Sequence, residues 1–120
     1  MTGETALRGR LLAITDELLA TEGVRGVSLR EIARRAGVSH GAPLRHFPSL
    51  ANLLAHVSAE GFRGLTDAMA AGASASGPSA RDRLAGAARG YCQFALGQPG
   101  LLTLMFRSLP WTMWTGTSGR

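Results

Sequence analysis

Residues 28–47 read SLREIARRAGVSHGAPLRHF, and this stretch decides the fold of the chain. Ser28 followed three residues later by Glu31 is typical of a capping box, in which each side chain satisfies a free backbone N–H of the other at a helix start. Gly37 can take the positive φ that ends this helix, and Ser39 can cap the next one. The pattern predicts two short helices joined by a tight turn.

The second of these helices is expected to run from His40 to about Phe47. Such a pair is typical of a helix-turn-helix, in which the exposed N-terminal end of the second helix meets base edges in the DNA major groove. Five arginines and a single acid lie between Arg25 and Arg45, which concentrates positive charge where phosphates would lie. The alternative is an αα-hairpin of a small helical protein without a role in DNA binding.

The same stretch resembles the DNA-binding domain of the tetracycline-repressor (TetR) family, which typically reads IA..AGVS.G..Y.HF. The matching residues are Ile32-Ala33, Ala36-Gly37-Val38-Ser39, Gly41 and His46-Phe47. The resemblance implies a transcriptional repressor that binds a palindromic operator as a homodimer and is released by a small hydrophobic effector. The residues that it implies in contact with double-stranded DNA are Ser28, Arg30, Ser39, His40, Gly41, Pro43, Leu44, Arg45 and His46.

The resemblance assigns base contacts mainly to the exposed end of the second helix. His40 and Gly41 would lie closest to the bases, Arg30 would point toward a guanine edge, and Arg45 would reach a base or a phosphate. Leu44 is apolar and suits a thymine methyl group, although packing against another helix explains it equally well.

Phosphate contacts are implied at several other positions. Ser28 and His46 would touch phosphates, and Arg8 and Arg10 lie close to where the first helix of the family touches the DNA backbone. The family usually has a phosphate-binding Tyr where Leu44 stands, and often a phosphate-binding Lys where Leu50 stands. We therefore expect weaker DNA binding than is typical of the family, with the base-reading positions unchanged.

Apolar residues at helical spacing predict an all-α protein on both sides of this motif. Residues 2–5 are expected to form a disordered arm, and a first helix follows up to Gly23. A connecting helix should begin at Leu50 and run for about twenty residues, up to a loop at residues 72–78.

Two more helices are expected after the loop. The first should begin at a cap formed by Ser79 and end at Gly97, and its buried stripe should consist of Leu84, Ala88, Tyr91 and Ala95. The second should begin at Gly100 and is apolar nearly all round. We expect its residues 101–106, together with Trp111 and Trp114, to be uncovered within one chain and to drive self-association.

These elements divide the chain into a helix-turn-helix DNA-binding domain at residues 1–48, a partial helical ligand and dimerisation domain at residues 49–110, and a tail at residues 111–120. Compared with the family, the chain is short and lacks most of the C-terminal effector domain. The alternative function is a truncated helical interaction protein that pairs through its C-terminal apolar segment and binds DNA weakly or not at all. An effector pocket, for which simple core packing is the alternative, would be lined by Met69, Tyr91, Cys92, Phe94 and Met105.

The remaining composition argues against other classes of protein. The formal charge is +5, and all thirteen basic residues are arginine. The acids do not converge with a histidine, and the three histidines lack the spacing of a metal site on one helix. A single cysteine excludes an intramolecular disulfide and suits the cytoplasm, and no apolar run is long enough to span a membrane. We therefore expect no enzyme activity, metal, cofactor or membrane anchor.

Overall fold

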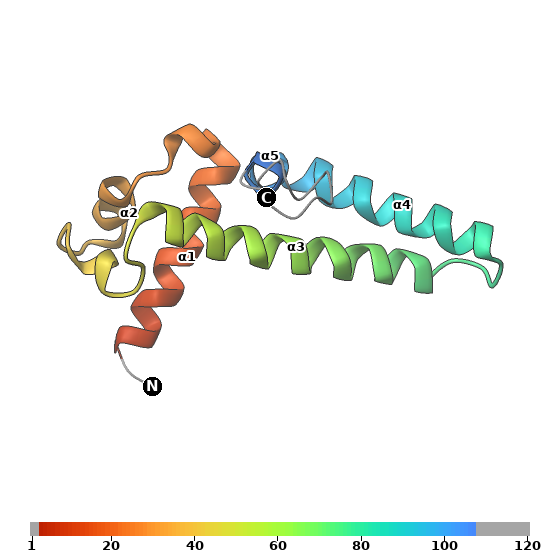
Figure 1. Ribbon diagram of the computed structural model, residues 1–120, viewed down its shortest axis with the longest axis horizontal. Helices are drawn as coiled ribbons and strands as arrows, with labels where there is room; N and C mark the ends of the chain where they lie inside the picture. The colour runs from red at the N-terminus through yellow and green to blue at the C-terminus, as the bar shows by residue number, and fades with distance from the viewer. Residues whose placement is uncertain (1–2, 108–120) are drawn as a thin grey trace, which may run out of the picture.

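The computed structural model describes residues 3–107, and every regular element in this range is helical, which confirms the predicted all-α class. A compact head lies at one end, and a long antiparallel helix pair extends from it (Figure 1). No helix within the described range combines the length and the apolar character that a membrane crossing requires. The elements are α1 (Gly3–Glu22), the 3-10 turn η1 (Val24–Gly26), α2 (Leu29–Ala36), the 3-10 turn η2 (Ala42–Arg45), α3 (Leu50–Ser74), α4 (Ala80–Gly97) and α5 (Pro99–Arg107).

The head has one core, to which α1, α2, the segment after η2 and the start of α3 contribute large apolar side chains. Each of the following is at most 1% exposed: Leu11, Leu18, Ile32, Phe47 and Leu53. The prediction of a disordered arm over residues 2–5 is wrong for Gly3–Thr5, because these residues form the first turn of α1.

The connecting helix is α3, which begins after Ser49, whose hydroxyl accepts a hydrogen bond of 3.0 Å from the N–H of Asn52. It runs to Ser74, so the expected loop starts three residues later than the sequence suggests. Alanines favour continuation of the helix, and Gly72 is retained in it because α4 crosses there. The cap of α4 at Ser79 and its end at Gly97 are confirmed.

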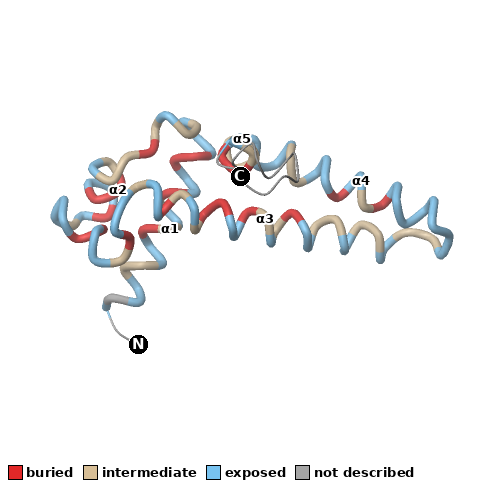
Figure 2. Tube along the Cα trace, viewed as in Figure 1, coloured by how far each residue is buried: buried red, intermediate tan, exposed pale blue. Residues whose placement is uncertain are grey.

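The face of α4 that packs on α3 is not the predicted apolar stripe. Gly86 and Gly90 are buried, whereas Leu84 is 73% exposed and Tyr91 36% exposed. A Cβ atom at Gly90 would overlap with the backbone carbonyl of Ala68, so the two helices are too close for a larger residue. The prediction is wrong because close packing selects glycine for the buried face and leaves the larger side chains outside, where Figure 2 shows α4 largely exposed.

The last helix, α5, returns to the head and packs on α1 and α3. Leu104 is 3% exposed and Met105 is fully buried. The expectation that residues 101–106 are uncovered within one chain is therefore wrong for these two side chains. Trp111 and Trp114, which were expected to extend the apolar surface, lie outside the described residues.

Gly90→Ala should destabilise the chain by about 1–3 kcal/mol, because the added methyl group would overlap with the Ala68 carbonyl. Gly9→Ala is the matched control, since a Cβ at this position of α1 meets nothing within 4 Å. That substitution should raise stability by up to about 1 kcal/mol. Urea unfolding followed by circular dichroism measures both, and a Gly90→Ala variant as stable as the parent would contradict the close crossing.

Candidate nucleic-acid interface

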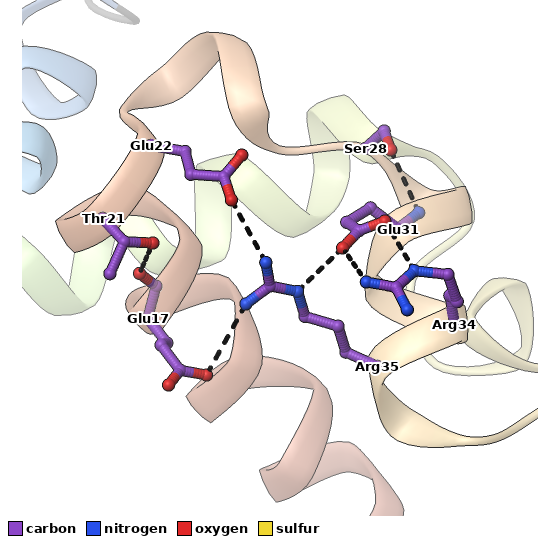
Figure 3. A network of polar contacts seen from close by, with 7 residues as sticks. All are labelled: Glu17, Thr21, Glu22, Ser28, Glu31, Arg34 and Arg35. Carbon is purple, nitrogen blue, oxygen red and sulfur yellow. Dashed lines mark hydrogen bonds and ion pairs between the residues drawn. The ribbon is translucent and has the colours of Figure 1, made fainter.

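The first half of the predicted capping box is present at the start of α2. The hydroxyl oxygen of Ser28 accepts a hydrogen bond of 3.1 Å from the N–H of Glu31. The Glu31 carboxylate is directed elsewhere, because it accepts bonds of 2.9 and 2.6 Å from Arg34 and one of 2.8 Å from Arg35 (Figure 3). The hydrogen bond from Arg34, and to a smaller extent the one from Arg35, lowers the pKa of Glu31 from 4.5 to about 2.

Arg35 also connects α2 to α1. One of its terminal nitrogens lies 3.1 Å from a carboxylate oxygen of Glu22, and the other lies 4.0 Å from Glu17 (Figure 3). With its bond to Glu31, this guanidinium group joins acids on both helices. The geometry fixes the orientation of α2 on α1.

The ion pairs of this network reduce the positive charge of the motif below the value that the sequence suggests. The sequence shows five arginines against Glu31 alone between residues 25 and 45, but the fold adds two acids from α1 to the same cluster. Two of the five arginines are therefore paired with acids. Among residues 3–107, Arg25, Arg30 and Arg45 make no ion pair, and these carry the uncompensated charge of the motif.

The turn after α2 has the predicted form. Gly37 lies in the left-handed region with φ 73° and ψ 31°, and its N–H donates to the carbonyl of Arg34 at 3.2 Å. The N–H of Val38 donates to the carbonyl of Ala33 at 3.1 Å. These bonds satisfy carbonyls at the end of α2 and direct the chain into the next segment.

The prediction of a second helix from His40 to about Phe47 is wrong, because this segment contains only the 3-10 turn η2 at Ala42–Arg45. Two prolines account for the difference. Pro43 has no N–H to donate to the carbonyl of Ser39, which would be the first bond of an α-helix starting at His40, and that carbonyl accepts from Ala42 instead. Pro48 disfavours the α conformation at Phe47, the last residue of the segment. The N–H of Leu44 instead donates to the carbonyl of Gly41 at 3.2 Å, which is the spacing of a 3-10 turn.

Most of the predicted DNA-contacting residues are accessible on α2 and the segment that follows it. Ser28 and His46 are half-buried. Pro43 is fully buried, so its side chain is not accessible for the expected contact with DNA. The exposed members, which offer guanidinium, hydroxyl, imidazole and apolar groups, are Arg30, Ser39, His40, Gly41, Leu44 and Arg45.

Arg8 and Arg10, which were expected to lie near the DNA backbone, both have partners inside the head. Arg10 donates a hydrogen bond to the backbone carbonyl of Ala36, at the end of α2. The guanidinium carbon of Arg8 lies 4.9 Å from the centroid of the Phe47 ring. Sequence inspection missed both contacts because their partners are far away along the chain.

The structure does not assemble the predicted effector pocket. Tyr91 and Cys92 are exposed on α4, whereas Met105 is buried beside Gly61. A separate groove of about 620 Å³ lies between η1, α3 and α5. Its lining residues are Val24, Ala51, Leu54, Ala55, Ser58, Ala59, Phe62, Leu104 and Arg107. The helical spacing of Leu54 and Phe62 was the available signal, and it predicted only the connecting helix.

No group of three or more His, Cys, Asp or Glu residues within the described range is arranged to hold a metal ion. The exposed set on α2, on η2 and in the turn between them is suited to binding nucleic acid. Its arginines and hydroxyl group suit phosphates, and its guanidinium and imidazole groups suit base edges.

Residues 11–57 match the family model described as "Bacterial regulatory proteins, tetR family". Among solved structures, the chain is 42% identical to one titled "Structure of a protein with unknown function from Rhodococcus sp. RHA1", with a TM-score of 0.77. The similarity covers 87% of this chain and 55% of that chain, so the present chain spans about half the length of its neighbour. No curated protein matches the chain.

Gly37→Val should destabilise the head by about 1–2 kcal/mol, because a β-branched residue is strained at φ 73° even though open space surrounds the position. Gly37→Asn is the matched control, since Asn tolerates the left-handed region far better. Thermal melting monitored by circular dichroism compares the two. If both variants melted together with the parent, the turn would have another conformation.

Stability should depend on the ionisation of Glu31. Because its pKa is lowered to about 2 in the folded state, its ion pairs contribute fully above pH 4.5 and are lost as the pH falls from 4.5 toward 2. Glu31→Gln should therefore lower the free energy of unfolding at pH 7. On acidification the variant should lose less stability than the parent. Asp67→Asn, at an exposed position of α3, is the control. Urea midpoints between pH 2 and 7 measure the effect, and parallel curves for the parent and Glu31→Gln would exclude it.

Proposed function

We propose, from the match of residues 11–57 to the tetR family of bacterial regulatory proteins, that the chain is a transcriptional repressor that binds double-stranded DNA sequence-specifically. The observation that carries the proposal is the exposed set on α2, on η2 and in the turn between them, all within the matched range. Arg30 and Arg45 are free of ion pairs among the described residues, so DNA would not have to displace an internal acid. Residues 1–48 would serve as the DNA-binding domain and residues 49–110 as the regulatory part.

We extend the proposal to a homodimer on a palindromic operator. The four-residue turn η2 offers few side chains to base edges, so one copy would make few specific contacts. Two copies on half-sites about 34–36 Å apart, or a multiple of that spacing, would combine their contacts and gain affinity. Repression would follow from occupation of the operator, and the protein would act in the cytoplasm.

A small hydrophobic effector is the proposed signal for release. The groove of about 620 Å³ has the size of a small-molecule site and is lined mainly by apolar side chains. Val24, which belongs to the link between α1 and α2, contributes to its wall together with Leu54 of α3 and Leu104 of α5. A ligand that prefers one arrangement of these three elements would shift the position of α2 and thereby weaken DNA binding.

Selection of bound duplexes from a random pool tests the proposed function. Arg30→Ala and Arg45→Ala should each reduce the preference at a particular base pair, by about 1–3 kcal/mol where a bidentate base contact is lost. Arg83→Ala is the matched control, because this exposed arginine lies on α4 outside the head. Its preferences should equal those of the parent. Equal affinity of the parent for selected and random duplexes at every salt concentration would refute sequence-specific binding.

A further inference from the structure

The reading segment, residues 37–46, is bounded on each side by a residue that contacts an arginine of α1. Ala36 precedes the segment, and its carbonyl accepts the hydrogen bond from Arg10. Phe47 follows the segment, and its ring lies under the guanidinium group of Arg8. Two arginines on one turn of α1 therefore hold both ends of the segment that carries most of the candidate DNA contacts.

The contact of Arg10 acts on the end of α2. The last carbonyls of a helix have no partner within the helix, and a cation placed there is favoured by the helix dipole. The N–H groups of Gly37 and Val38 already serve the carbonyls of Arg34 and Ala33. Arg10 serves the carbonyl of Ala36 and thereby fixes where α2 ends relative to α1.

The contact of Arg8 acts on the other end of the segment. Phe47 is 1% exposed, and its N–H donates to the carbonyl of Pro43 at 2.9 Å, so the position of its ring is tied to that of η2. A guanidinium group over an aromatic face is attracted by the ring electrons. The ring of His56 lies 5.9 Å from the Phe47 ring and supports it from α3. Displacement of Phe47 would therefore move η2.

We propose that Arg8 and Arg10 are positioning residues that hold the reading segment against α1, and that neither serves as a phosphate ligand. The inference rests on the proposed DNA-binding function. A phosphate ligand contributes one counterion to the salt dependence of binding and leaves base preference unchanged. A positioning residue has the opposite signature, because its loss alters the geometry of several base contacts without removing a contact to DNA.

The first measurement is amide hydrogen exchange of the full chain without DNA. Arg10→Ala should accelerate exchange at Gly37 and Val38 about fivefold, which corresponds to a hydrogen bond worth about 1 kcal/mol. Arg10→Lys, which retains a cationic donor, should restore slow exchange. Arg8→Ala should instead accelerate exchange at the amide of Phe47. Arg25→Ala is the matched control, since Arg25 is exposed and makes no ion pair among the described residues.

The second measurement is the salt dependence of binding to a selected duplex. Arg10→Ala should alter base preference and leave the slope of log K against log salt unchanged. A slope reduced by about one, with unchanged base preference and unchanged exchange, would identify Arg10 as a phosphate ligand and overturn the proposal. Acceleration spread evenly over the core would also overturn it, because Arg10 would then support the whole fold. If the parent selected no duplex, the proposed function would fail, while the exchange data would still test the positioning role.

Discussion

The packing of α2 against α1 is the contact on which the rest of the head depends. Leu18 of α1 and Ile32 of α2 are fully buried in the same core as Phe47. Full burial of such side chains contributes about 1.5–3 kcal/mol each, whereas exposed ion pairs add little to stability. The apolar core therefore supplies the stability of the contact. The Arg35 network and the bond from Arg10 are directional, and they determine how α2 is oriented within that contact.

Features that depend on neighbouring residues could be predicted from the sequence. The caps at Ser28 and Ser79 and the left-handed turn at Gly37 are local, because each involves residues three or four positions apart. The 3-10 turn departs from the family pattern because Pro43 and Pro48 disfavour a regular α-helix over residues 40–47.

Features that depend on the distance between elements could not be predicted. The apolar stripe of α4 assumed that large side chains face inward, but α3 and α4 cross too closely at Gly86 and Gly90 to admit them. The bond from Arg10 joins residues 26 positions apart, so no local pattern reveals it. The groove likewise combines three separate elements, whereas the predicted pocket relied on residue types alone.

The central claim is that α2 and the reading segment form the surface that binds DNA. Titration of the isotopically labelled chain with a selected duplex, followed by backbone amide chemical shifts, tests this claim most directly. The account predicts that shift changes concentrate at Arg30, at residues 39–41 and at residues 44–46, while the amides of α4 remain unchanged. Changes concentrated on α4, with those segments unaffected, would contradict it.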